Sequence, residues 1–299
     1  MKIAMVAPPW FAIPPTGQGG AQAVVEVLVE ELVRRGEHVV LYSVGGTRTS
    51  AELRWLYERE QKDVLATKPM TAVDSAHVAF AFGDAIAEGA DIIHDHSGRV
   101  GPTVAAFATG VPVLHTVHTS LHGAARRLYG LLPQRAGFGL NAVSESQRSQ
   151  APEVPIMGVV HNGIDTGVFS LCEEKDDYLL MLSRITPDKG CHVAMDVARA
   201  AGVPLKLAGR PDPTAGGRAY FADEIEPRLG PGIEYLGPVG VAEKVPLLAH
   251  ARALLLPAQW EEPCSIAVLE ALASGTPVIA TPRGGLPEQI RDGVEGFLC

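Results

Sequence analysis

Short apolar runs alternate along this chain with longer stretches in which apolar residues recur at helical spacing. One stretch, 21–35, has Val25, Leu28 and Leu32 at that spacing and ends at Gly36, which predicts a helix. The apolar runs of the first half predict strands at 2–7, 38–43, 91–94, 111–117, 140–143 and 156–160. These runs are β-branched and apolar throughout, as is typical of strands covered on both faces in parallel sheets.

The second half repeats the same rhythm. Its apolar runs predict strands at 178–183, 205–208, 233–236, 253–257 and 277–280, separated by helices at 191–201, 220–229, 241–249 and 266–274. Alternating strands and helices indicate βαβ units and parallel sheets. The polar, unpatterned stretch 169–177 separates the two sets. We therefore expect an α/β protein with two doubly wound domains, at 1–168 and 169–299.

The composition agrees with two globular domains. A length of 299 residues corresponds to about two domains of roughly 150 residues each. Hydrophobic residues make up 46% of the chain and charged residues 20%, which supports sizeable cores and excludes a disordered chain. The net charge of −9 and the absence of a Lys/Arg block argue against nucleic-acid binding. No apolar run reaches about 18 residues, so no transmembrane segment is expected.

The cysteines and the N-terminal sequence indicate the cellular compartment of the protein. Cys172, Cys191, Cys264 and Cys299 form no CxxC pair, which fits a reducing environment better than a disulfide framework. The sequence MKIAMVAPPW enters a strand without the apolar region of a signal peptide. We therefore expect a cytoplasmic protein. The chain stops at 296–299, inside or just after a predicted strand, so we also expect the C-terminal domain to lack its terminal helices.

A glycine-rich segment, TGQGGA at 16–21, follows the first strand and opens the first helix. Gly19 and Gly20 let the backbone approach a ligand, and a helix N-terminus offers free N–H groups. Gln22 stands where GxGxxG has its third glycine, and no acidic residue ends the strand 39–43, which disfavours a Rossmann dehydrogenase. A plain strand-to-helix turn explains the segment equally well.

Two cations, Arg184 and Lys189, follow the strand predicted at 178–183. Open α/β sheets bind ligands at the carboxyl ends of their strands. A departing nucleoside diphosphate needs positive charge most in the transition state. From the spacing alone, a solvated turn with two surface charges is the more common explanation.

Two carboxylates, Glu262 and Glu270, stand eight positions apart. Glu262 precedes a predicted helix, and Glu270 is expected about two turns in on the same side. Carboxylates accept hydrogen bonds from vicinal sugar hydroxyls. Alternatively, Glu262 caps the helix and Glu270 is a surface charge. The apolar neighbours of Glu270 argue against that alternative, because a carboxylate in an apolar helix is costly unless it is paired.

Histidines gather in two short segments. His94 and His96 flank Asp95, a pattern that could belong to a metal site. No third and fourth ligand is evident, so we favour a structural or acceptor-side role for this motif. His115 and His118 lie three positions apart, and His115 by itself is explained as a core histidine with its hydrogen bonds satisfied.

Together these segments resemble the family-4 glycosyltransferases of the GT-B fold, in glycosyltransferase group 1. The resemblance is carried, in family order, by GGA at 19–21, DIIHDH at 91–96, HTVH at 115–118, VSES at 143–146, HNGID at 161–165, SRITPDKG at 183–190, IEYLGPV at 233–239, the Glu-x7-Glu run at 262–270, ASGTPVIA at 273–280 and GGLPE at 284–288. The Glu-x7-Glu run followed by ASGTPV is the most specific of these motifs. The resemblance implies two Rossmann-like domains facing a central cleft, with the acceptor on the N-terminal side and the nucleotide sugar on the C-terminal side.

The resemblance also implies roles for individual residues. Arg184 and Lys189 match the pair on the donor diphosphate, Glu270 the ligand of the donor ribose, and Glu262 the carboxylate beside the donor sugar. His118 matches the histidine near the reacting sugar. The residues expected to act in catalysis are His118, Arg184, Lys189 and Glu262. Those expected to bind the nucleotide sugar are Gly19, Gly20, Arg184, Lys189, Glu262, Ser265, Ile266 and Glu270.

The family is retaining and usually independent of metal ions, so no cofactor or metal is expected here. The chain has no Asp-x-Asp motif, and Arg184 and Lys189 would neutralise the charge that a metal neutralises elsewhere. Cys264 and Ser265 replace the aromatic residue and glycine that the family usually has, which leaves the donor sugar open. The acceptor, a sugar, a lipid-linked or a small molecule, is also open. The alternatives are a nucleotide-sugar epimerase of the same fold and a non-catalytic nucleotide-sugar-binding protein.

Overall fold

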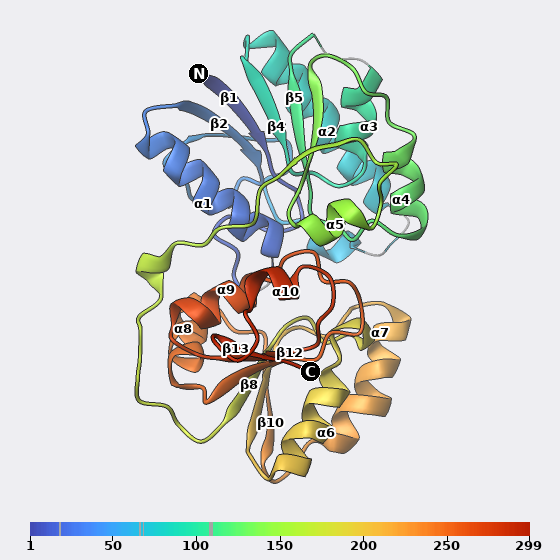
Figure 1. The fold of residues 1–299 in the computed structure, drawn as a ribbon. Helices are drawn as coiled ribbons and strands as arrows, with labels where there is room; N and C mark the ends of the chain where they lie inside the picture. Colours follow the sequence, from blue (N-terminus) through green and yellow to red (C-terminus); the bar gives the residue numbers. More distant parts are fainter. Residues whose placement is uncertain (18, 66, 68, 108–109) are drawn as a thin grey trace. The chain divides into compact units, whose positions relative to one another are not determined.

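The computed structural model describes residues 1–17, 19–65, 67, 69–107 and 110–299, and divides the chain into two compact units (Figure 1). Met1–Pro15 and Gly19–Gly163 form the N-terminal unit, and Ile164–Cys299 make up nearly all of the C-terminal unit. Both are α/β units built on one parallel sheet. The division at 163/164 lies five residues before the boundary expected from the sequence, and the polar stretch 169–177 leads into the second sheet.

The N-terminal sheet has seven parallel strands in the order β3-β2-β1-β4-β5-β6-β7. Its strands are β1 (Lys2–Val6), β2 (His38–Ser43), β3 (Glu52–Trp55), β4 (Ile92–Asp95), β5 (Val113–Val117), β6 (Phe138–Ala142) and β7 (Ile156–Val159). The apolar pattern missed β3, because this edge strand is exposed at both of its ends and carries Glu52 and Arg54.

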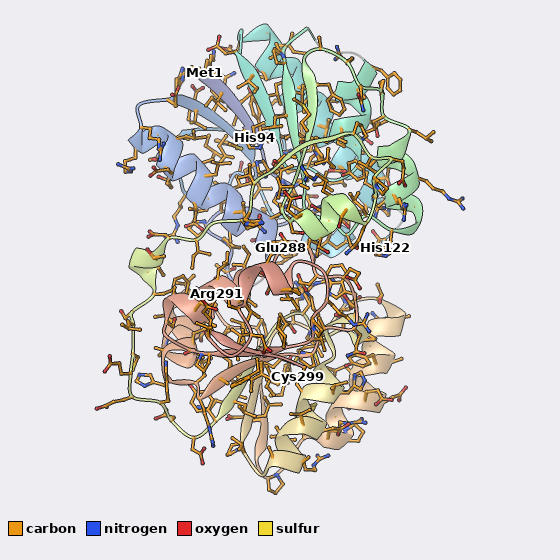
Figure 2. All side chains as sticks on the ribbon, viewed as in Figure 1. Met1, His94, His122, Glu288, Arg291 and Cys299 are labelled. Carbon is orange, nitrogen blue, oxygen red and sulfur yellow. The ribbon has the colours of Figure 1, made fainter. Side chains whose placement is uncertain are left out.

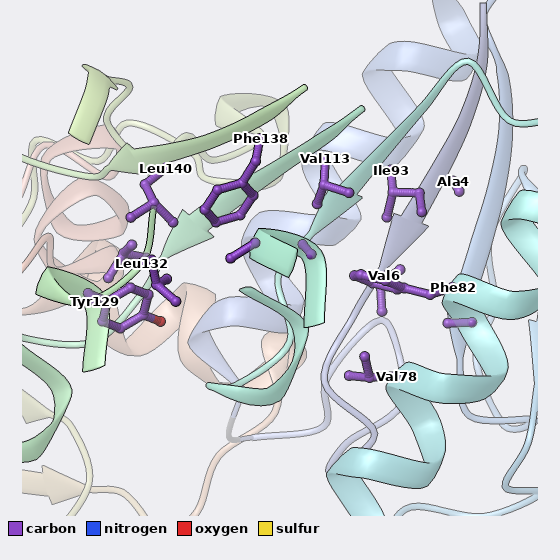
Figure 3. Close-up of a cluster of buried hydrophobic side chains, with 14 of the residues drawn as sticks. Ala4, Val6, Val78, Phe82, Ile93, Val113, Tyr129, Leu132, Phe138 and Leu140 are labelled. Carbon is purple, nitrogen blue, oxygen red and sulfur yellow. The ribbon is translucent and has the colours of Figure 1, made fainter. Parts of the chain in front are cut away.

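Helices cover both faces of this sheet. They are α1 (Gly20–Arg34), α2 (Met70–Ala87), α3 (Val100–Phe107), α4 (Gly123–Gly130) and α5 (Glu145–Ser149), with a 3₁₀ turn η1 (Lys62–Val64). Met5 and Leu41 pack with Val25 of α1 on one face. Val6 packs with Phe82 of α2 on the other, in the larger core cluster of Figure 3. Burial on both faces explains why the strands are apolar throughout.

The C-terminal sheet has six parallel strands in the order β10-β9-β8-β11-β12-β13. They are β8 (Leu179–Leu182), β9 (Leu205–Ala208), β10 (Ile233–Gly237), β11 (Ala253–Leu256), β12 (Val278–Ala280) and β13 (Gly296–Leu298). Met181 packs with Met195 on one face, whereas Leu180 packs with Val268 on the other. The expectation of two doubly wound parallel sheets is therefore confirmed.

The helices of this unit are α6 (Cys191–Ala201), α7 (Ala215–Tyr220), α8 (Val241–His250), α9 (Ile266–Ala273) and α10 (Leu286–Gln289), with short turns η2 (Thr166–Val168), η3 (Pro187–Lys189), η4 (Phe221–Ile225) and η5 (Glu226–Arg228). The helix predicted at 220–229 is wrong: α7 ends at Tyr220 and continues as a π-helical turn and a 3₁₀ turn. Pro227 has no N–H to donate, so an α-helix is not maintained there. Within the described ranges, no helix combines the length and apolarity needed to cross a membrane.

Each sheet has one point at which the strand order reverses. In the N-terminal sheet, β1 and β4 lie side by side, and in the C-terminal sheet β8 and β11 do. Ligands of open α/β sheets bind outside the carboxyl ends of the strands at such switch points. The segments that leave these four strands carry Gly19, His96, Lys189 and Glu262. The fold therefore gathers the predicted functional residues at the switch point of each sheet.

Two glycines at the ends of α6 provide a matched test of this packing. Gly190 and Gly202 both have left-handed φ angles, of 72° and 65°. A Cβ at Gly190 would overlap the carbonyl oxygen of Pro257, whereas no atom lies within 4 Å of one at Gly202. We expect Gly202→Ala to cost about 1–2 kcal/mol, the penalty for a left-handed alanine. Gly190→Ala should lower the Tm at least twice as much in thermal unfolding followed by circular dichroism, and equal decreases would contradict the close approach.

Candidate active site

The glycine segment of the N-terminal unit is shaped by steric limits. Gly19 has φ 138° and precedes α1, and among the described residues no side chain caps the N-terminus of this helix. A Cβ at Gly19 would lie 2.9 Å from the Cβ of Pro15, so only glycine fits. Gln22 donates its side-chain N–H to the carbonyl of Pro8 at 3.3 Å and so fastens the start of α1 to the loop. Gln18 of the same motif lies outside the described residues.

Three side-chain pairs join the carboxyl ends of β4 and β5. They are His94 Nε2 with Thr116 Oγ1 at 2.9 Å, Asp95 Oδ2 with His115 Nδ1 at 2.6 Å, and His96 Nδ1 with His118 Nε2 at 2.8 Å. Successive side chains of a strand point to opposite faces. Asp95 and His115 therefore lie on one face of the sheet, and the other two pairs lie on the other. Figure 2 labels His94, at the end of β4.

The Asp95–His115 pair belongs to the interior. Asp95 Oδ1 accepts the N–H of Ser97 at 3.0 Å, and His115 Nε2 lies 3.0 Å from the hydroxyl of Tyr129. Asp95, His115 and Tyr129 are fully buried, and burial raises the pKa of Tyr129 well above its usual range. The interpretation of His115 as a satisfied core histidine is confirmed. Within the parts of the chain that the structure describes, no group of three or more His, Cys, Asp or Glu could hold a metal ion.

The opposite face carries a row of imidazoles. The His94 and His96 ring centroids are 4.2 Å apart, and those of His96 and His118 are 5.1 Å apart. Burial lowers the pKa of His94 to about 4 and that of His118 to about 3. These rings are therefore neutral at physiological pH, and His118 is the partly exposed end of its hydrogen-bonded pair.

Sequence reasoning missed two buried groups of α2. Burial raises the pKa of Asp74 to about 6, although hydrogen bonds from the backbone of Gly98 and Val100 oppose the rise. His77 Nε2 lies 2.8 Å from the carbonyl oxygen of Ala7, and burial lowers its pKa. Both have apolar neighbours in α2, such as Val73 and Val78, which is the kind of signal that singled out Glu270. They tie α2 to neighbouring segments and have a structural role.

In the C-terminal unit, Arg184 and Lys189 both follow β8 but differ in environment. The Arg184 side chain is 43% exposed, with its guanidinium 3.8 Å from the carboxylate of Asp188. The Lys189 side chain is only 12% exposed, forms an ion pair with Glu262 and lies 4.8 Å from the centre of the Trp260 ring. The alternative of two solvated surface charges is therefore wrong for Lys189.

Both carboxylates of the Glu-x7-Glu run are buried and paired. Glu262 is 6% exposed and also accepts the indole N–H of Trp260 at 2.9 Å, whereas Glu270 is 5% exposed and forms an ion pair with Lys244 of α8. Neither a helix cap nor a surface charge describes them. Burial raises the pKa of Glu270, and the positive charge of Lys244 opposes that rise.

The geometry corrects one detail of this run. Helix α9 begins at Ile266, so Glu270 lies about one turn into it rather than two, and Glu262 lies in the preceding loop. The helix is preceded by Ser265, whose side chain makes no capping hydrogen bond. The loop after β11 continues without helix as far as Ser265, so α9 begins four residues after Glu262.

The loop that carries Glu262 is clasped by the segment around α10. The N–H of Gly285 donates to the carbonyl of Glu262 at 2.7 Å. The Ser265 N–H donates to Gln289 Oε1 at 2.8 Å, and Gln289 Nε2 donates back to the Ser265 carbonyl at 2.9 Å. The backbone amide of Ser265, expected to meet the donor, is therefore engaged by Gln289. Ile266 follows as the first residue of α9.

Lys244, Trp260 and Gln289 are thus residues of this site that sequence reasoning missed. Lys244 left a weak signal, as the single lysine of the helix predicted at 241–249. Trp260 and Gln289 left none, because their contacts depend on how separate loops meet.

Comparisons with known proteins place this geometry in a family. The sequence model of "Glycosyltransferase Family 4" matches residues 18–168, and that of "Glycosyl transferases group 1" matches residues 169–299. The D-inositol 3-phosphate glycosyltransferase of Mycobacterium avium (strain 104) is 28% identical, over 96% of this chain and 78% of that protein.

Solved structures of glycosyltransferases are also similar to this chain. AviGT4, a glycosyltransferase involved in avilamycin A biosynthesis, superimposes with a TM-score of 0.71 at 27% identity, over 96% of this chain and 80% of that one. Anabaena Alr3699/HepE in complex with UDP gives a TM-score of 0.73 at 19% identity, over 100% and 85% of the two chains, and shows the fold alone. The family models together cover nearly the whole chain, and the two parallel sheets are those of the GT-B fold. The chain belongs to glycosyltransferase family 4 and is a glycosyltransferase.

Proposed function

We propose that this enzyme transfers a sugar from a nucleotide-sugar donor to an acceptor with retention of the anomeric configuration. The observation that carries the proposal is the pair of buried carboxylates, Glu262 and Glu270, each paired with a lysine of another segment. Buried charges are costly, and such groups at a switch point are typical of functional sites.

The donor diphosphate is assigned to Arg184 and Lys189. The 3.8 Å contact of Arg184 with Asp188 is loose and solvent-exposed, so exchanging it for a phosphate costs little. Lys189 is held in place by Glu262 and Trp260, which makes it a fixed charge. Fixed charges stabilise the negative charge that develops on the departing diphosphate without reorganising during the reaction.

The nucleoside and the sugar are assigned to the two glutamates. An ionised Glu270 can accept hydrogen bonds from both ribose hydroxyls, and Glu262 can accept from a hydroxyl of the donor sugar. Ser265 and Ile266 would meet the donor through their backbone amides, and for Ser265 this requires Gln289 to turn away. Gly19 and Gly20 would let the N-terminal loop approach phosphate and acceptor.

Retention follows if the acceptor hydroxyl attacks on the face from which the diphosphate departs. The C–O bond to the diphosphate breaks, the new C–O bond forms on the same side, and the acceptor proton passes to the departing phosphate oxygen. No protein base is needed in this scheme. His118, whose pKa is lowered to about 3, stays neutral and orients the sugar through hydrogen bonding.

Substrates to try first come from the related proteins. The solved structures of Alr3699/HepE contain UDP, UDP with glucose, or UDP-glucose. UDP and UDP-glucose are therefore the first donor probes. The name of the Mycobacterium avium relative makes D-inositol 3-phosphate the first acceptor to try.

A thermal-shift panel of UDP, GDP, ADP and dTDP, with their glucose and mannose forms, tests the donor site. We expect one nucleotide to raise the Tm, because a ligand that binds only the native state stabilises it. Arg184→Ala should weaken the binding of that nucleotide about tenfold or more, because a charge-assisted hydrogen bond is lost. Arg252→Ala, a surface arginine before β11, is the matched control. The donor site is disproved if no nucleotide raises the Tm, or if both variants bind normally.

The ionisation of Glu270 should be visible in stability. Its pKa is raised in the folded state, so the unfolded chain releases this proton at lower pH. The wild type should lose stability as pH rises from the usual glutamate pKa through the raised one. Glu270→Gln lacks that loss, so its Tm relative to wild type should increase as the pH rises above the usual glutamate pKa of about 4. Glu234→Gln, at an exposed glutamate, is the control. If the Tm of Glu270→Gln and that of wild type depend on pH in the same way, the raised pKa of Glu270 is refuted.

Product analysis tests retention and metal independence together. With the donor and acceptor that give turnover, proton NMR should show a glycoside with the anomeric configuration of the donor. Excess EDTA should leave the rate unchanged, because Arg184 and Lys189 supply the positive charge. An inverted glycoside, a rate abolished by EDTA, or a free epimerised sugar would each contradict the proposed reaction.

A further inference from the structure

One motif is not used by the proposed function: the His94-Asp95-His96 segment. His96 is 2% exposed, and its Nδ1 lies 2.8 Å from Nε2 of His118. Its other nitrogen, Nε2, is buried and has no hydrogen-bond partner within the described part of the chain. The two rings therefore share one hydrogen bond whose direction decides the tautomer of both.

Proton counting leaves two arrangements. A neutral imidazole carries one N–H and one acceptor nitrogen. Burial lowers the pKa of both His96 and His118, so both rings are neutral. If His118 donates from Nε2, the proton of His96 must lie on its own Nε2, where it is a buried N–H without an acceptor. If His96 donates from Nδ1, only a lone pair of His96 is left unused.

The second arrangement is the more favourable. A buried N–H without an acceptor is rarer in proteins than an acceptor with unused capacity, and it costs the full desolvation of the donor. His96 Nδ1–H therefore donates to His118 Nε2. Because that nitrogen of His118 accepts, its single proton lies on Nδ1.

We propose that His96 is a positioning residue that holds His118 as the neutral Nδ1–H tautomer, so that His118 meets the transferred sugar as a hydrogen-bond donor. The sugar contact rests on the proposed function, whereas the tautomer does not. In this state His118 Nε2 is occupied by a hydrogen bond and Nδ1 already carries a proton. The ring is thus a donor and not a general base, which agrees with transfer of the acceptor proton to the departing phosphate.

The strand register explains why a histidine, and not the neighbouring carboxylate, faces His118. Asp95 lies on the opposite face of the sheet, where its carboxylate binds His115 and the Ser97 N–H. A carboxylate beside His118 would favour a protonated ring. A neutral imidazole in that place orients His118 without charging it.

NMR of protein labelled with ¹⁵N at histidine tests the tautomer directly. The ¹⁵N shifts of an imidazole distinguish a protonated from an unprotonated nitrogen, and His118→Gln identifies the His118 signals by their loss. We expect Nδ1 of His118 to be protonated and Nε2 unprotonated. The opposite pattern would overturn the proposal. The measurement is made on the free protein, so it is independent of any donor or acceptor.

Variants of His96 test its positioning role. His96→Asn keeps a side-chain N–H close to the position of Nδ1 and should preserve the Nδ1–H tautomer of His118. His96→Leu removes the donor and should shift His118 toward Nε2–H. His77→Gln, at a buried histidine that contacts Ala7, is the control for destabilisation alone. It should leave the His118 signals unchanged, and an unchanged tautomer in His96→Leu would disprove the role of His96.

Kinetics then separates this inference from the proposed function. With a donor and acceptor that give turnover, His96→Leu should lower kcat/KM about fivefold and His96→Asn less than about twofold, since one neutral hydrogen bond is worth about 1 kcal/mol and tenfold corresponds to about 1.4 kcal/mol. Equal rates in His96→Leu and wild type would overturn the positioning role. If no donor gives turnover but the tautomer is as inferred, the proposed function fails and the direction of the His96–His118 bond stands.

Discussion

The reversal of strand order in a parallel sheet is the constraint on which the candidate site depends. At that point two neighbouring strands send their following segments to opposite faces, which leaves polar groups at their carboxyl ends without a covering helix. In the C-terminal unit this brings Lys189, after β8, to Glu262, after β11, although 73 positions separate them. In the N-terminal unit His96 follows β4, which borders the switch point, and meets His118 after the neighbouring strand β5, where the strand order does not reverse. Strand adjacency, and not sequence proximity, makes these pairs.

Burial makes such pairs necessary. Glu262 and Glu270 are both buried, Glu270 beside Val268 and Ala271 of a hydrophobic core cluster, and each carboxylate would be costly without its lysine. Breaking one pair leaves an uncompensated charge in the interior. The same lysines are positive groups that a phosphate or a sugar hydroxyl can share. In the proposed function, stability and donor binding therefore draw on the same contacts, so a variant here must be judged by both Tm and binding.

Local patterning predicted most of the fold. Between β1 and β12, continuous apolar runs identified every strand that the structure describes except the polar edge strand β3. The helix predicted at 220–229 was wrong because Pro227 interrupts the hydrogen-bond pattern. The same patterning predicted the charged residues of the candidate site but not their partners. The apolar neighbours of Glu270 indicated from the sequence that its carboxylate must be paired. Its partner Lys244, however, lies 26 positions away on another helix. Such partners follow from packing, which periodicity does not encode.

The replacement of the family's usual glycine by Ser265 illustrates the same limit. Ser265 has φ −81° and ψ 118°, an ordinary extended conformation that any residue adopts. The loop shape therefore does not require glycine, and the serine adds no backbone strain. At this position Gln289 and the backbone of Ser265 exchange two hydrogen bonds. In the proposed donor site a phosphate would accept the same Ser265 N–H that Gln289 Oε1 accepts here, so Gln289 would have to release that N–H for the donor to bind.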